Sequence, residues 1–343
     1  MTRDCYQLTV TSVIRETADA CSLVLSVPAE LASVFDYRPG QFITVRVPSA
    51  QTGSVARCYS MSSMPGASSL TITVKRTADG YASGYLHERV LPGSVLDVLP
   101  PAGTFTPAGP SGLDGSFLMF AAGSGITPVM SILTSVLRAG RGRVVLVYAN
   151  RDEQSVIFGA ALRSLMAEYP GRLTLLHWLD SLHGMPSVES ICSLVRPYAA
   201  DYEPYICGPD AFLQVVRSAL SSLGVAGRTV RVERFLSLAE NPFESVSVSP
   251  DGGVDATLTV SLDGDTRVLP WPAGARMLDV LIAAGLDAPF SCRQGVCGAC
   301  TCQLTGGKVD MAHNQVLEDA DLADGYILAC QSVALTPEVS IDY

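Results

Sequence analysis

Apolar and polar residues alternate with a period of two through the first hundred residues of the chain. The clearest alternating segments are Gln7–Thr11, Ser22–Val27, Gln41–Val47 and Leu70–Lys75. Pro-Gly pairs separate several of them, at positions 39–40, 65–66 and 92–93. Alternation buries one face of a strand, and short strands divided by turn dipeptides are typical of antiparallel barrels. The pattern therefore predicts an antiparallel β-barrel over residues 1–112.

From residue 116 onward, mostly apolar runs alternate with segments of helical spacing. The runs are Phe117–Ala121, Val144–Tyr148, Leu173–His177 and Pro204–Cys207. Three of the segments that follow predict helices, at Thr127–Leu137, Gly159–Tyr169 and Ala211–Leu223. Strands that alternate with helices indicate a parallel sheet covered on both faces. Residues 113–236 are therefore expected to form an α/β domain.

The last third of the chain begins with a stretch that lacks periodicity. Residues 237–253 are rich in Ser, Pro, Gly and Asn, which predicts a linker. Beyond it, alternating segments on either side of Asp263-Gly264 predict a hairpin, and Met277–Ala284 predicts a short helix. Residues 254–343 should thus form a third, α+β domain, and the whole chain is multidomain.

Composition and charge narrow the class of protein. Of 343 residues, 48% are hydrophobic and 16% charged, which suits several compact domains. No apolar run reaches the ~18 residues of a membrane span and no secretion signal is evident, so we expect a cytoplasmic monomer that binds no membrane. Residues 251–343 carry 13 acidic and 4 basic side chains. This excess disfavours nucleic acid and favours a basic protein partner, although solubility alone would also explain it.

Four cysteines of this third domain have a spacing that indicates metal chemistry. Cys292, Cys297 and Cys300 form a C-x4-C-x2-C pattern, and Cys330 follows at a distance. This is the plant-type [2Fe-2S] spacing, whereas zinc sites usually pair C-x2-C with a second such pair or with His. We therefore predict a [2Fe-2S] cluster on these four thiolates, with structural zinc as the alternative. Cys302 is expected to be a packed residue and not a ligand.

Candidate flavin-binding residues lie in the first domain. Arg57 offers a cation for a pyrophosphate, Tyr59 an aromatic surface and Ser60 a hydroxyl, with Arg57 and Tyr59 on one face of a strand. Gly80–Ser83 opens a helix whose unpaired N–H groups could hold a phosphate. An ordinary amphipathic strand and a plain helix cap are the alternatives for these two segments.

Candidate nicotinamide-binding residues follow strands of the second domain. Gly123 and Gly125 lie between a strand and a helix, where glycine lets a dinucleotide approach the backbone, although the segment is not G-x-G-x-x-G. Cys207-Gly208 ends a later strand and could border the nicotinamide, or could simply be a buried Cys before a turn. Asp152 could accept the adenosine ribose hydroxyls and favour NADH, whereas adjacent Arg151 could bind a 2′-phosphate.

Together, in this order, these motifs resemble the ferredoxin–NADP reductase superfamily. The resemblance rests on Arg57-x-Tyr59-Ser60, Gly80-x-x-Ser83, Gly123–Pro128 and Cys207–Pro209, and the C-terminal cysteines add a ferredoxin-like (β-grasp) domain. The order of flavin, nicotinamide and iron–sulfur segments is that of phthalate dioxygenase reductase and of phenylacetyl-CoA epoxidase reductase. Longer segments, at 52–60, 74–83, 148–152, 175–179 and 283–292, are similar to the reductase components of actinobacterial 3-ketosteroid 9α-hydroxylases. Met61 with Ser62 and Ser63 departs from the Leu-Cys that such relatives often carry.

The resemblance implies FAD rather than FMN, NADH as electron donor and a Rieske-type oxygenase as acceptor. It further implies that Lys75 and Ser83 flank the flavin, that Thr127 lies near its reactive edge, and that Cys207 and the segment Glu233–Phe235 border the nicotinamide. The expected function is an NADH-dependent reductase that converts hydride transfer into single-electron transfer. The alternatives are the reductase of another multicomponent oxygenase, a stand-alone flavin oxidase or quinone reductase, and a zinc-binding module.

Overall fold

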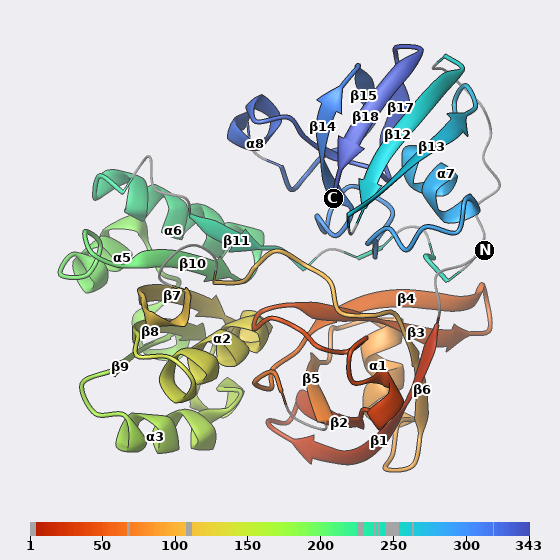
Figure 1. Cartoon of the computed structure of the whole chain (residues 1–343). Coiled ribbons are helices and arrows are strands. Elements are labelled where there is room, and N and C mark those ends of the chain that lie inside the picture. The colour runs from red at the N-terminus through yellow and green to blue at the C-terminus, as the bar shows by residue number, and fades with distance from the viewer. Residues whose placement is uncertain are drawn as a thin grey trace.

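The computed structural model describes residues 5–66, 69–107, 112–225, 230–235, 237–238, 241–243, 254–262, 264–317 and 319–343. The chain forms three separate larger sheets, one in each part predicted from the sequence, and a small two-stranded sheet. In Figure 1 the N-terminal barrel (red and orange) lies below the C-terminal domain (blue), and the middle domain (yellow to green) lies beside both.

The first domain is an antiparallel barrel with strand order β4-β3-β6-β1-β2-β5. Its strands are β1 (Tyr6–Arg15), β2 (Ala20–Ser26), β3 (Phe42–Ser49), β4 (Gly53–Ser60), β5 (Ser69–Lys75) and β6 (Val95–Val98). A bridge between Met61 and Ile72 joins the end of β4 to β5 and closes the barrel. The inward residues, such as Leu23, Ile43 and Val98, are fully buried. The 3-10 turn η1 (Ala29–Leu31) and helix α1 (Tyr81–Glu88) complete the domain.

The second domain is a parallel sheet with strand order β11-β10-β7-β8-β9. Its strands are β7 (Ser116–Ala122), β8 (Arg143–Asn150), β9 (Leu173–Leu179), β10 (Glu203–Cys207) and β11 (Arg231–Glu233). Its helices are α2 (Ile126–Arg138), α3 (Gly159–Glu168), α4 (Asp180–His183), α5 (Val188–Val195) and α6 (Asp210–Ser222), with 3-10 turns η2 (Gly112–Asp114), η3 (Gly123–Gly125) and η4 (Glu153–Ser155). Separate apolar clusters form on the α2–α3 face and on the α5–α6 face, so both sides of the sheet are covered.

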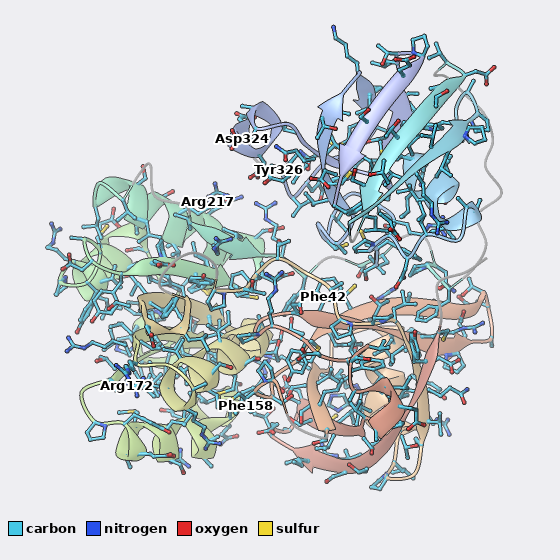
Figure 2. The ribbon with its side chains drawn as sticks, viewed as in Figure 1. Phe42, Phe158, Arg172, Arg217, Asp324 and Tyr326 are labelled. Atoms are coloured by element: carbon cyan, nitrogen blue, oxygen red, sulfur yellow. The ribbon has the colours of Figure 1, made fainter. Side chains whose placement is uncertain are left out.

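One arginine of the second domain fixes the end of α2. Arg172, labelled in Figure 2, donates to the carbonyl oxygens of Val136, Leu137, Gly140 and Gly142 at 2.9–3.0 Å. A cation that pairs with the last carbonyl groups of a helix satisfies acceptors that lack partners within the helix. This interaction ties the C-terminal end of α2 to the start of β9.

The third domain combines a mixed sheet, in the order β13-β12-β18-β14-β16, with a short helix. Its strands are β12 (Ala256–Leu262), β13 (Asp265–Trp271), β14 (Thr301–Gly306), β16 (Tyr326–Leu328) and β18 (Glu338–Asp342), and β15 (Val309–Met311) pairs with β17 (Ser332–Ala334). Helix α7 (Met277–Ala283) buries Leu278 and Leu281 against the sheet, and α8 (Asp319–Ala323) precedes β16. This arrangement is the predicted α+β ferredoxin-like domain.

The sequence predictions of fold class are confirmed. Helices α2, α3, α6 and α7 differ from their predicted bounds by at most one residue at either end. The predicted hairpin is β12–β13, with Asp263 of its turn outside the described residues. Most of the predicted linker also lies outside the described residues. No helix in the described part of the chain has the length and apolar character to cross a lipid bilayer.

Candidate functional site

Residues 291–300, which we call the cluster loop, lie between helix α7 and strand β14 and end directly before β14. Three of its residues have positive φ, namely Arg293 at 59°, Gly295 at 71° and Gly298 at 69°. Gly295 has a second requirement, because a Cβ there would lie 2.4 Å from the carbonyl oxygen of His313. The loop therefore curls tightly, and glycine is needed where the curl meets the neighbouring chain.

The four predicted ligands lie together as two pairs of thiols. Hydrogen bonding between Cys292 and Cys297, and between Cys330 and Cys300, lowers the pKa of Cys292 and Cys330 and raises that of Cys297 and Cys300. The amides of Gln294 and Cys330 donate to the sulfurs of Cys292 and Cys300 at 3.3 and 3.5 Å. Two thiol pairs fit a cluster in which each of two irons takes two cysteines. Within the described residues, no three His, Cys, Asp or Glu side chains are grouped as they would be round a single metal ion.

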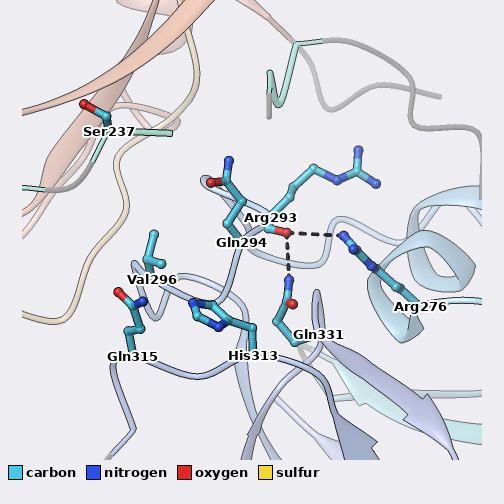
Figure 3. Close-up of a pocket in the computed structure, with 8 residues that line it drawn as sticks. All are labelled: Ser237, Arg276, Arg293, Gln294, Val296, His313, Gln315 and Gln331. Atoms are coloured by element: carbon cyan, nitrogen blue, oxygen red, sulfur yellow. Dashed lines mark hydrogen bonds between the residues drawn. The ribbon is translucent and has the colours of Figure 1, made fainter. Parts of the chain in front are cut away.

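A polar cavity of about 400 Å³ adjoins the cluster loop (Figure 3). On its wall the side chains of Gln331 and Arg276 both donate to the carbonyl oxygen of Arg293, at 2.8 and 3.5 Å. The Gln331 amide also lies 3.5 Å from the Cys330 sulfur. The Arg293 guanidinium pairs with Asp279 and lies over the Phe290 ring. These contacts hold the cluster loop in place.

The predicted flavin residues line one cavity of about 260 Å³ between the barrel and the second domain. Members of the predicted set that line it are Arg57, Tyr59, Ser60, Lys75, Gly80, Ser83, Thr127 and Phe235. Arg57 and Tyr59 lie on the same face of β4, as predicted, and burial raises the pKa of Tyr59 well above its usual range. A cation, an aromatic ring and hydroxyl groups around one cavity fit the pyrophosphate, ring and ribityl groups of a flavin.

Two helix starts border this cavity. Gly80 is the N-terminal cap of α1, and Ser83 Oγ donates to the Gly80 carbonyl and accepts from the Thr77 amide at 3.0 Å. On the opposite wall Thr127 Oγ1 donates to the Ser124 carbonyl at 3.0 Å, in the first turn of α2. The Ser83 hydroxyl therefore bonds to the backbone at the start of its own helix, which favours the plain helix cap as the role of this side chain. The first turn of α1 nevertheless lines the cavity.

The two glycines after β7 have different roles. Gly123 has a φ of 53°, and a Cβ there would lie 3.4 Å from Lys75 Nζ. A Cβ at Gly125 would lie only 2.1 Å from the carbonyl oxygen of Cys207. Gly125 therefore allows the β7–α2 turn to pack against the end of β10, and Gly123 keeps space open beside the Lys75 cation.

A second cavity, of about 300 Å³, lies at the carboxyl end of β10 and is lined by Ser124, Gly208, Pro209, Asp210, Arg234 and Phe235. Cys207 is fully buried beneath it, in the apolar cluster on the α2 face, and burial raises the pKa of its thiol. Glu233 is half-buried, and burial raises the pKa of its carboxyl to about 8. A cavity at the carboxyl ends of parallel strands is where nucleotides bind in such sheets.

A third, small space joins all three domains. It has about 30 Å³ and is lined by Phe42 and Cys58 of the barrel, Glu233 and Phe235 of the second domain, and Cys297 of the cluster loop, among others. Figure 2 shows Phe42 on the side of the barrel that faces the third domain. Because Cys58 and Phe235 also line the flavin cavity, that cavity lies next to the cluster loop.

Comparison with known proteins matches three family profiles to the three domains. An oxidoreductase FAD-binding domain matches residues 7–106, an oxidoreductase NAD-binding domain residues 119–218, and a 2Fe-2S iron-sulfur cluster binding domain residues 260–335. The "3-ketosteroid-9-alpha-monooxygenase, ferredoxin reductase component" of Mycobacterium tuberculosis H37Rv is 52% identical, over 98% of this chain and 95% of that protein. The chain belongs to the family of monooxygenase ferredoxin reductase components.

Two further relatives of this reductase component extend the comparison. A polypeptide of the 1,2-phenylacetyl-CoA epoxidase of Escherichia coli K12 is 36% identical, over 98% of this chain and 97% of that polypeptide. The structure of phthalate dioxygenase reductase matches with a TM-score of 0.58 and 26% identity, over 99% of this chain and 98% of that one. The reductase component is an oxidoreductase that carries electrons from NADH through FAD to a [2Fe-2S] cluster, and an oxygenase is its partner.

The remaining predicted residues lie outside these cavities. Asp152 is half-buried and accepts hydrogen bonds from the Ser155 amide and hydroxyl at 2.9 and 2.7 Å, which hold its pKa below the ordinary value. Arg151 pairs with Asp19 of the barrel at 2.9 Å. Cys58, Phe42 and Leu238 were not among the predicted site residues. Cys58 is the variable position of the Arg57-x-Tyr59-Ser60 motif, and Phe42 and Leu238 belong to no motif of the sequence analysis.

Proposed function

We propose that the chain is the reductase of a 3-ketosteroid 9α-monooxygenase and delivers its electrons to a Rieske-type oxygenase component. The observation that carries this proposal is the 52% identity to the M. tuberculosis ferredoxin reductase component, which extends over 98% of this chain and so over all three domains. The 36% identity to the epoxidase polypeptide over a similar span makes an epoxidase reductase the second candidate.

The arrangement of residues suits the division of labour in such a reductase. A flavin held in this cavity would supply the conversion of a hydride from nicotinamide into single electrons, which a one-electron centre requires. The chain's own contribution is to position the cofactors. Arg57 and Lys75 supply cations to the flavin cavity, and Ser124 and Phe235 line both this cavity and the nucleotide cavity. The cluster loop lies against the barrel strand that carries Arg57 and Tyr59. We therefore assign binding and orientation to these side chains, with no acid–base step.

Reconstitution tests the choice of partner. The purified chain, NADH and the oxygenase component of a 3-ketosteroid 9α-monooxygenase should give hydroxylated steroid coupled to NADH oxidation. Parallel assays with the epoxidase oxygenase and phenylacetyl-CoA should be at least about tenfold slower at equal protein concentration, which corresponds to ~1.4 kcal/mol of discrimination between the two interfaces. Faster electron delivery to the epoxidase would replace the first candidate with the second.

We also propose that the chain acts as a cytoplasmic monomer with NADH as its preferred donor. The acidic charge, at −10 for the whole chain, supports repulsion between copies. Light scattering of the purified holoprotein should give a mass near the 36.2 kDa of one chain, and twice that mass would contradict the proposal.

A further inference from the structure

The contact between the barrel and the cluster loop contains a buried polar group that the mechanism above does not use. Around it the contact is apolar: Ala56, Leu238 and Cys292 are buried together, with Cys58 and Val296 packed against them. These residues come from β4, from the segment after β11 and from the cluster loop. We call this contact the seam.

One short hydrogen bond joins the two sides of the seam. Thr44 Oγ1 on β3 lies 2.6 Å from Ser291 Oγ, the residue directly before the ligand Cys292. Both side chains are buried, at 0% and 1% exposure, and the residues are 247 positions apart in the chain. Thr44 also lies 3.4 Å from the sulfur of Cys58, its partner across the β3–β4 pair. The two buried hydroxyl groups and the thiol thus serve as hydrogen-bond partners for one another inside the seam.

The position of this group relates it to both redox sites. Cys58 lies between Arg57 and Tyr59 and lines the flavin cavity, and it also lines the small space that Cys297 closes. Ser291 is covalently next to a cluster ligand. A change in the Thr44–Ser291 distance must therefore move the cluster loop relative to the flavin-binding strand.

We propose that Thr44 and Ser291 form an interdomain latch that keeps the cluster loop seated on the flavin-binding strand, and that they are positioning residues for electron transfer from the flavin to the cluster. A buried hydroxyl that loses its partner is costly, whereas loss of both partners together is less so. Opening the seam replaces this bond by bonds to water, so the latch favours the seated arrangement by the net contribution of one buried hydrogen bond.

Thr44→Val, Ser291→Ala and the double variant test the latch in the full holoprotein. Hydrogen exchange followed by mass spectrometry, over peptides 53–60 and 289–298, measures how often the seam opens. Each single variant should exchange about tenfold faster there, equivalent to ~1.4 kcal/mol. Because the double variant leaves no unpaired hydroxyl, its effect should be smaller than the sum of the two single effects. Thr44→Ser, which keeps the hydroxyl, should behave as wild type.

Stopped-flow absorbance separates the latch from a general loss of structure. NADH-driven flavin reduction should stay within about twofold of wild type, while cluster reduction should slow relative to it in the single variants. Ser135→Ala is the matched control, since Ser135 is a buried hydroxyl that bonds within α2 to Ser131; it should change neither seam exchange nor cluster reduction. The proposal would be overturned if both single variants kept the wild-type rates of seam exchange and cluster reduction. It would also be overturned if the effects of the two substitutions on exchange were strictly additive, or if flavin reduction slowed as much as cluster reduction.

Discussion

Cys300 and Cys302 are two residues apart yet lie in different chemical settings. Both are buried in the core of the third domain, but Cys300 hydrogen-bonds with Cys330 in the second thiol pair, whereas Cys302 lies outside both pairs. Because Cys302 belongs to neither thiol pair, it is not expected to be one of the four cluster ligands.

We therefore expect replacement of Cys292, Cys297, Cys300 or Cys330 by Ala to abolish the [2Fe-2S] absorption spectrum, because each removes one of four thiolates. NADH-driven flavin reduction should survive. Cys302→Ala is the control and should keep the spectrum, since it shortens a packed side chain only. A cluster retained in Cys300→Ala, or lost in Cys302→Ala, contradicts the ligand assignment.

Arg57 provides the cation proposed for the flavin pyrophosphate. Arg57→Ala should lower flavin affinity by about tenfold or more, because a charge-assisted hydrogen bond contributes ~1.5–3 kcal/mol. Titration of the deflavinated protein with FAD measures this. Arg76→Ala is a suitable control, since Arg76 pairs with Glu88 on the exposed side of the barrel. Equal affinity in Arg57→Ala and wild type would remove Arg57 from the site.

Glu233 should give the protein a characteristic pH dependence. Burial raises the pKa of its carboxyl from 4.5 to about 8, so the folded state holds this proton more tightly than the unfolded chain. The resulting stability is present below the ordinary pKa of 4.5 and is lost as pH rises toward 8. Glu233→Gln cannot ionise, so its melting temperature should exceed that of wild type increasingly from about pH 5 to pH 8 and then by a constant margin. If the difference in melting temperature between the two proteins did not change with pH, the pKa of Glu233 would be the same in the folded and unfolded states.

At the scale of elements, the turn after β8 bears on the choice between NADH and NADPH. Asp152 caps the start of η4, where hydrogen bonds from Ser155 keep it a carboxylate, and Arg151 is paired with Asp19. A fixed negative charge repels a 2′-phosphate, and a cation that already has a carboxylate partner attracts it less.

We expect kcat/KM for NADH to exceed that for NADPH by at least about tenfold, which is ~1.4 kcal/mol in transition-state binding. Asp152→Asn should narrow the ratio, mainly by improving the reaction with NADPH. Arg151→Ala should leave the NADH value nearly unchanged. If wild type prefers NADPH and Arg151→Ala removes that preference, Arg151 is the residue that reads the phosphate.

The elements also show where sequence reasoning succeeds and where it stops. Helices α2 and α6 follow from apolar spacing, and the predicted ligands Cys292, Cys297 and Cys300 from their close spacing, because both signals are local. Strand β6 has only four residues, and its position between β1 and β3 is decided by pairing partners far away in the chain. The Thr44–Ser291 contact is beyond such reasoning, since neither residue belongs to a motif and 247 positions separate them. Domain bounds of 1–112, 113–236, 237–253 and 254–343 stay predictions, which limited proteolysis can test.

At the scale of the whole molecule, charge is concentrated on the domain that must meet the oxygenase. Residues 251–343 hold 13 of the 33 acidic side chains but 4 of the 23 basic ones. Asp319, Asp321 and Asp324 lie on or just after α8, before β16 and Cys330, while Glu318 lies outside the described residues. If this charge steers docking to a basic partner face, salt should slow electron delivery, since the Debye length is ~8 Å at physiological ionic strength.

Neutralising Glu318, Asp319 and Asp321 together should slow oxygenase reduction several-fold at low salt and flatten its salt dependence. Flavin reduction by NADH, followed by stopped flow, should not change and serves as the control. Asp265, Glu338 and Asp342 are exposed acids on β13 and β18, and their replacement by Asn, Gln and Asn offers a matched change of three charges elsewhere on the domain. An unaltered rate and salt slope in the triple variant would make the α8 acids a solubility feature only.

The segment between the second and third domains contacts the barrel at several described residues between 238 and 243. Asn241 donates to Ser54 Oγ at 2.7 Å, Leu238 is buried in the seam, and Arg46 lies over the Phe243 ring. The last described contact with the barrel before the third domain is therefore at Phe243 and not at the end of β11, which confines an unseated cluster domain to a small search volume. In such a volume the effective concentration of one domain around the other is of millimolar order. The rate at which the cluster domain returns to the barrel is then first order and does not depend on protein concentration. Electron transfer from the cluster to the oxygenase, in contrast, requires a bimolecular encounter and does depend on concentration.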